Sequence, residues 1–206
     1  MSLLKKIFSA GGGRDTVPIF PLKSVLFPDG LLALRIFEVR YMDMAKACLR
    51  EKSPFGVCLI REGEEVGTPA VPHEVGCLAS IVVCDMEELG ILKVTALGGE
   101  RFRLASTTTE ASGLIVGEIE PIGAEGPAPD APGLDACSTL LRKLVAGIGE
   151  ERFAPPLRFE DASWVSFRLA EILPLRNDVR QKMLEVTDAS LRIGVLYRFL
   201  RQQKLV

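Results

Sequence analysis

Apolar residues in the first half of the chain repeat with a period of two, which predicts β-strands. Between residues 31 and 37, Leu32, Leu34 and Ile36 share one face of the predicted strand. The other face is also largely apolar, so we expect this strand to be buried. Further apolar runs predict strands over residues 55–61, 77–86, 91–97, 101–109 and 114–122.

Turn and helix signals separate these strands. Residues 38–51 change to helical spacing, with apolar residues along one stripe and charged residues opposite. Gly98 and Gly99 predict a tight turn, and the segment 62–76, EGEEVGTPAVPHEVG, predicts a surface loop. Pro18, Pro21 and Pro28 have no N–H for a sheet ladder, so we expect them at strand ends or edges.

The second half of the chain has helical spacing after a break. Residues 123–133, GAEGPAPDAPG, combine glycine and proline without apolar periodicity and predict a linker. Helices are predicted over residues 134–147, 162–173, 177–185 and 189–203, with Asp161 and Asp188 as N-caps. Four short helices would pack as a bundle.

The fold class is therefore α+β, with a rolled sheet or barrel followed by helices. We place a β domain at residues 14–122, the linker at 123–133 and the helical bundle at 134–206. Residues 1–13 are expected to form a flexible or short helical N-terminus, because apolar residues at helical spacing precede three glycines there.

Composition and charge exclude several classes of protein. A hydrophobic content of 48% in 206 residues supports a sizeable core. A net charge of -2 and a pI near 5.6 give no overall attraction for nucleic acid or for an anionic membrane, so neither is an expected partner. No apolar run approaches the roughly 18 residues of a membrane span, and the N-terminal run is too short for a signal peptide. We expect a cytoplasmic protein.

Catalytic and metal-binding motifs are missing from the sequence. The single histidine, His73, lies in the predicted loop, and no G-x-S-x-G elbow or phosphate-binding P-loop occurs. The five cysteines lack C-x-x-C spacing and lie in apolar runs, so we interpret them as reduced, inert core residues. We therefore expect no catalytic residue, no metal and no cofactor.

Several segments taken together resemble a known family. In chain order, PIFPL, VLFPDGLLALRIFEVRY, FGVCLI, VGT and GGERFRL resemble the N-terminal substrate-binding domain of Lon proteases, over about Thr16–Leu104. The resemblance implies a pseudo-barrel of about six strands with one helix, followed by a helical bundle, that recognises polypeptide. A chain of this length lacks room for the family's ATPase and protease modules, so we expect a stand-alone domain. Val39 stands where the family commonly has proline.

Unfolded or extended polypeptide is thus the expected ligand, with a protease or chaperone as a further candidate partner. A groove for such a ligand needs aromatic and aliphatic surface with a few polar groups. Candidates that combine these properties near the strongest motif are Phe27, Pro28, Phe37, Glu38, Arg40, Tyr41 and Phe55. An alternative interpretation gives the same residues structural roles, with Glu38 and Arg40 in ion pairs and the Tyr41 ring in the core.

Other ways of acting remain open from the sequence. An extended ligand could add a strand to a sheet edge through main-chain bonds, which requires few particular side chains. Small barrels also bind RNA, although no basic stripe with aromatic residues is visible here. A hydrolase would need a cleft with strongly shifted ionisable groups.

Overall fold

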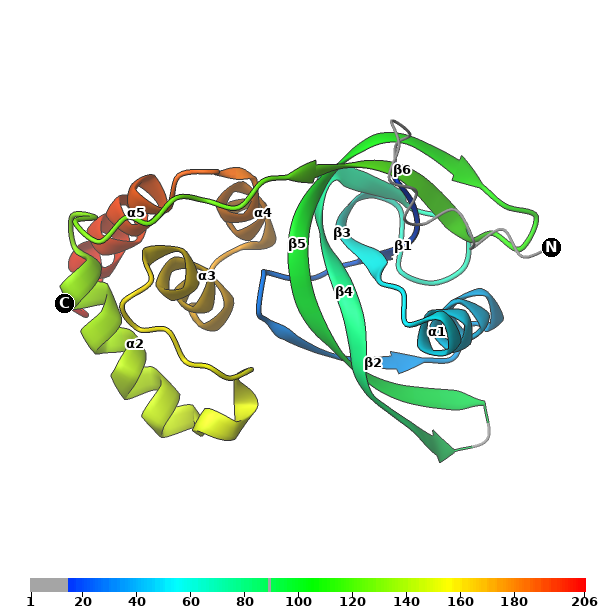
Figure 1. Cartoon of the computed structure of the whole chain (residues 1–206), viewed down its shortest axis with the longest axis horizontal. Coiled ribbons are helices and arrows are strands. Elements are labelled where there is room, and N and C mark those ends of the chain that lie inside the picture. Colours follow the sequence, from blue (N-terminus) through cyan, green and yellow to red (C-terminus); the bar gives the residue numbers. More distant parts are fainter. Residues whose placement is uncertain (1–14, 89) are drawn as a thin grey trace.

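The computed structural model describes residues 15–88 and 90–206, so the predicted N-terminal segment 1–13 lies outside the described residues. Figure 1 shows a rolled sheet on the right and a group of helices on the left. The sheet part contains β1 (Asp15–Leu22), β2 (Leu31–Ile36), α1 (Val39–Glu51), β3 (Phe55–Glu62), β4 (Val71–Glu88), β5 (Ile91–Thr109) and β6 (Ile115–Ile122).

The six strands form one mixed sheet in the order β2-β5-β4-β3-β1-β6, and a further pairing of β5 with β6 closes a ring. β5 makes closure possible because it is long. Its first half pairs with β2, and its second half reaches β6 at the other end of the strand order. One face of α1 packs against the roll, where Tyr41, Met44 and Cys48 join a core with residues of β1 and β2. The expected pseudo-barrel with one inserted helix is confirmed.

The predicted turn at Gly98 and Gly99 is wrong, because β5 runs through both residues without reversing. A Cβ atom on Gly98 would lie 2.1 Å from the carbonyl oxygen of Phe27. Gly98 also exchanges backbone hydrogen bonds of 2.8 Å with Asp29 and Gly30, which lead into β2. The glycine therefore permits close approach of two backbones, a second reason for glycine besides a turn.

The predicted loop at residues 62–76 is too long, because β4 already begins at Val71. Val75 and Cys77 are buried in this strand, which pairs with β5 on one side and β3 on the other. The prediction relied on the glycine and proline content of this segment and missed the strand that begins at Val71.

Two of the prolines lie inside β1. Pro18 lies where β1 pairs only with β6, and Pro21 lies where β1 pairs only with β3. Each missing N–H thus has an unpaired side to face.

The helical part follows the prediction closely. It contains α2 (Leu134–Ile148), a short 3-10 helix (Glu150–Arg152), α3 (Ala162–Ile172), α4 (Asn177–Glu185) and α5 (Ala189–Gln202). Asp161 and Asp188 cap α3 and α5 by accepting hydrogen bonds from two backbone N–H groups each, as predicted. None of the described helices is long and apolar enough to cross a membrane.

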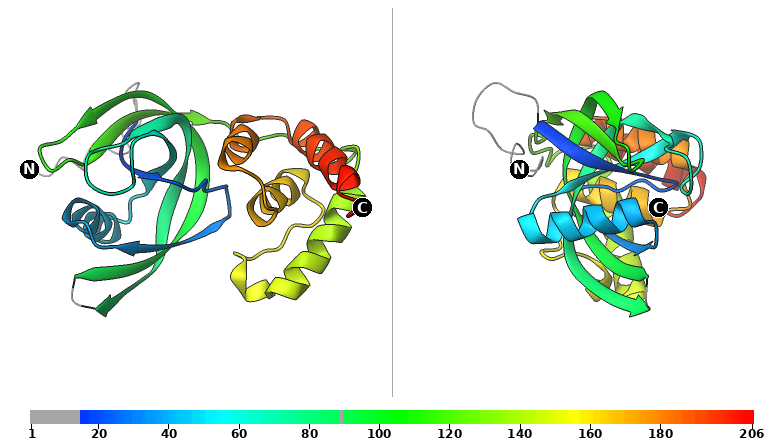
Figure 2. Two further views of the ribbon diagram at one scale, coloured as in Figure 1. Left: turned by 180° about the vertical axis from the view of Figure 1, so that it is seen from behind. Right: turned by 90° about the vertical axis from the view of Figure 1, so that its right-hand side faces the viewer.

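The two parts share a core. Phe27, from the chain between β1 and β2, packs on Phe167 of α3 with ring centroids 5.5 Å apart. Val75 of β4 belongs to the same buried cluster as the helices. The left view in Figure 2 shows the helices beside one end of the rolled sheet.

Candidate functional site

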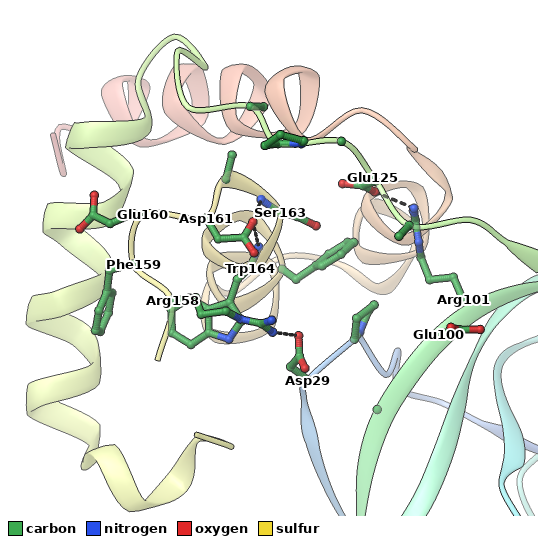
Figure 3. Close-up of a pocket in the computed structure, with 18 of the residues that line it drawn as sticks. Asp29, Glu100, Arg101, Glu125, Arg158, Phe159, Glu160, Asp161, Ser163 and Trp164 are labelled. Atoms are coloured by element: carbon green, nitrogen blue, oxygen red, sulfur yellow. Dashed lines mark hydrogen bonds and ion pairs between the residues drawn. The ribbon is translucent and has the colours of Figure 1, made fainter. Parts of the chain in front are cut away.

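Two concave surfaces stand out among the described residues. The larger one, which we call the junction cleft, lies between the rolled sheet and the helices and has a volume of about 1090 Å³ (Figure 3). Its walls are residues 98–101 of β5, the connecting segment 122–129 and residues 157–164 around the start of α3. The smaller one lies beside β2.

Ion pairs occupy the charged side chains of the junction cleft. Arg158 pairs with Asp29 across the cleft, as Figure 3 shows, and Arg142 pairs with Glu160. Asp161 is used as the α3 cap. Of these contacts, the Arg158–Asp29 pair joins the helical part to the sheet part, and the other two lie within the helical part.

A buried network at Glu125 ties three segments together. The Glu125 carboxylate accepts hydrogen bonds of 2.6 Å from both Arg101 of β5 and Arg192 of α5. Arg101 also donates to the carbonyl oxygens of Leu184 and Val186 at 2.8 and 2.7 Å. Burial lowers the pKa of Arg101 below its ordinary value, and the Glu125 carboxylate opposes that shift. Residue 125 therefore anchors the predicted linker.

The chemistry of the junction cleft is thus largely structural. Most of its charged side chains are paired, and the buried pair among them, Arg101 with Glu125, is of the kind that requires partners. In the described part of the chain, no three His, Cys, Asp or Glu side chains gather where they could hold a metal ion.

The cysteines follow the sequence prediction except for one. Cys48, Cys58, Cys77 and Cys137 are buried, but Cys84 is exposed, so the expectation of a core thiol is wrong there. Cys84 lies on the stretch of β4 that extends past its pairing with β3. Burial raises the pKa of Cys77 to about 12 and that of Cys137 to about 11, which keeps these thiols protonated.

We expect a single fast-reacting thiol in the folded chain. Ellman's reagent at mildly alkaline pH should modify Cys84 quickly, because its sulfur is exposed to the reagent. The four buried thiols should react only after denaturation. In Cys84→Ser the fast phase should vanish; its persistence would show that another thiol is accessible.

The smaller surface, which we call the β2 groove, has a volume of about 290 Å³. It runs along residues 32–38 and is bounded by side chains from β1, α1 and the β3–β4 loop. The lining residues outside β2 and its extension are Phe20, Leu22, Ser24, Tyr41, Glu65 and Val66. Phe20 stacks on Tyr41 with ring centroids 4.1 Å apart and provides a rigid apolar wall.

The predicted site residues divide between these places. Phe37, Glu38 and Tyr41 line the β2 groove, while Pro28 lines the junction cleft. Phe27 and Phe55 are completely buried. Binding would reach these two rings only if the core opened.

The ionic candidates have structural partners. Arg40 donates to Glu38 at 2.9 Å and to the carbonyl oxygen of Gly113 at 3.0 Å, and its guanidinium lies 4.7 Å from the centroid of the Tyr41 ring. Arg40 and Tyr41 are both buried. These contacts match the structural interpretation, and they fix the end of the groove where β2 passes into α1.

Exposed apolar side chains gather at the β2 groove. Phe37 is 54% exposed, and Val66, from the β3–β4 loop, lies across the groove and is also exposed. Sequence analysis missed Val66 because it is a single apolar residue in an acidic, glycine-rich loop. A lone valine between glutamates and glycines was the only available signal.

Comparison with known proteins agrees with this architecture. The profile described as "ATP-dependent protease La (LON) substrate-binding domain" matches residues 16–202. No protein of curated function matches the chain.

Solved structures give the same assignment. A Lon N-terminal domain protein from Xanthomonas campestris is 32% identical, with a TM-score of 0.74 over 88% of this chain and 96% of that one. The N-terminal domain of the Lon protease of Mycobacterium avium complex shares the fold at 16% identity, with a TM-score of 0.65 and the same coverage. This chain belongs to the family of Lon N-terminal substrate-binding domains.

Proposed function

We propose that this chain is a noncatalytic domain that binds extended segments of protein substrates in the β2 groove. The family is described as substrate-binding, and its match fills residues 16–202 of the 206. The observation that carries the site is the pair of exposed apolar side chains, Phe37 and Val66, on the groove rim. Exposed apolar surface around a concave feature is typical of binding sites.

The groove suits an adaptor or holdase better than an enzyme. Its floor is apolar, with Leu34 and Ile36 buried beneath the rim. The nearest carboxylates, Glu38 and Glu65, accept hydrogen bonds from Arg40 and from the backbone N–H of Lys23. The side chains of the groove would therefore contribute mainly through shape and apolar contact.

Removal of the Phe37 ring should weaken binding with the fold unchanged. For Phe37→Ala we expect Kd for a permanently unfolded probe, reduced and carboxymethylated α-lactalbumin, to rise about tenfold, since truncation of an interface anchor to alanine costs about 1–2 kcal/mol. Fluorescence anisotropy measures Kd, and circular dichroism checks the fold.

A matched control is available on the helical part. Leu191 of α5 is 52% exposed, close to the value for Phe37, but lies outside both concave surfaces. Leu191→Ala should bind like the wild type. Equal affinity of Phe37→Ala and wild type would remove the β2 groove as the binding site.

A further inference from the structure

β2 is the terminal strand of the sheet. It pairs with β5 over six consecutive residue pairs, Leu31↔Leu97 to Ile36↔Leu92, and with no other strand among the described residues. A terminal strand presents backbone N–H and C=O groups that can pair with another chain.

The hydrogen bond from the Gly98 N–H to the Gly30 carbonyl fixes the phase of the ladder. In antiparallel pairing, residues alternate between those bonded to the partner strand and those whose backbone groups point away. Counting from Gly30, the backbone groups of Leu32 and Leu34 point toward β5. Those of Leu31 and Ala33 point away from it, and no hydrogen bond from either is found within the described residues.

The β2 groove lies alongside this edge. Consecutive residues from Leu32 to Glu38 line it, including Ala33 and Leu34, whose side chains lie on opposite faces of the strand. A groove above one face would be lined by every second residue. The groove therefore lies beside the edge of the strand and not above one of its faces.

Another stretch of strand is also paired on one side only, but it is less suited to pairing. Beyond Ala79, β4 pairs only with β5 in the described structure, and its register shifts between Ile81 and Val83 and between Met86 and Glu88. Bulges of this kind twist an edge and disfavour addition of a strand. The β2 ladder has no such shift, and it has a groove beside it.

We propose that an extended polypeptide adds to the outer edge of β2 as an extra strand, held by main-chain hydrogen bonds to Leu31 and Ala33. This inference rests on the proposed function and specifies how the ligand is bound. The added strand would continue both faces of β2, where Leu34 and Ile36 are buried and Ala33 is exposed. Its favoured sequence therefore has apolar side chains at every second position, with the Phe37 ring covering one end.

N-methylation of single peptide bonds tests this directly. The probe is the tightest binder among overlapping short peptides of carboxymethylated α-lactalbumin, methylated at each backbone nitrogen in turn. In an added strand only every second N–H faces β2. We expect methylation at alternate positions to raise Kd about tenfold or more and methylation at intervening positions to change it little.

The outcomes separate the inference from the proposed function. Tight binding that depends on Phe37 but shows no alternation would overturn strand addition and leave the binding function standing. Failure of every peptide and of the intact unfolded probe to bind would overturn both. Alternation in Kd would support strand addition.

A variant of the protein provides an independent measurement. Ala33→Pro removes one outward N–H and leaves the bonds to β5 in place, because proline is tolerated at strand edges. It should lower affinity for the unmethylated peptide, whereas Ala33→Ser, which keeps the N–H, should not. If Ala33→Pro binds like Ala33→Ser with its fold verified by circular dichroism, the edge is not used.

Discussion

Replacing Glu125 with alanine should lower the free energy of unfolding by about 3–5 kcal/mol, the range for breaking a buried ion pair. The Arg101 and Arg192 side chains are 4% and 0% exposed, so loss of the carboxylate would leave two buried cations without their counter-charge. Unfolding in urea, followed by circular dichroism, measures the change.

An exposed ion pair supplies the control. Glu160 pairs with Arg142, but its side chain is 88% exposed, so Glu160→Ala should cost less than about 1 kcal/mol. Glu125→Gln keeps hydrogen-bond acceptance without the charge and should lie between the two. If Glu125→Ala is no more destabilising than Glu160→Ala, the network does not join the two parts as described.

Replacing Gly98 with alanine should destabilise the fold by about 3 kcal/mol, the upper end of the usual cost of overpacking. The added Cβ would lie 2.1 Å from a backbone oxygen, so the segment Phe27–Gly30 or β5 itself must move. Because Gly98 bonds to Asp29 and Gly30, the displacement would also reach the start of β2. Thermal and urea unfolding of the variant measure the cost.

The neighbouring glycine makes a close control. A Cβ on Gly99 would have its nearest neighbour at 3.6 Å, an ordinary contact, so Gly99→Ala should unfold within about 1 kcal/mol of the wild type. Equal stability of the two alanine variants would contradict the tight packing of β5 against the Phe27 carbonyl.

Local signals in the sequence predicted the helical part well. Asp161 and Asp188 cap α3 and α5 by accepting hydrogen bonds from N–H groups two and three residues further along the chain, so this signal is local. The features that the prediction missed depend on contacts between residues that are distant in sequence. The pair Gly98 and Gly99 is locally typical of a turn, yet the role of Gly98 depends on Phe27, which is far away in sequence.

The candidate site residues also divide into those with a local sequence signal and those that depend on distant contacts. Phe37 and Glu38 stand beside a strand-to-helix junction that periodicity reveals, and they do line the β2 groove. Phe27 and Phe55 had the same appearance in sequence, but their burial depends on strands and helices elsewhere in the chain. The roles of Val66 and Glu125 were invisible locally, because each acts against residues of distant elements.

Backbone amide NMR of the full chain, titrated with carboxymethylated α-lactalbumin, shows directly where an unfolded polypeptide binds. We expect shift changes centred on residues 31–38 and on Val66, with the Ala33 amide becoming slower to exchange with solvent. Changes confined to the junction cleft around Trp164, or none at all at saturating probe, would contradict binding in the β2 groove.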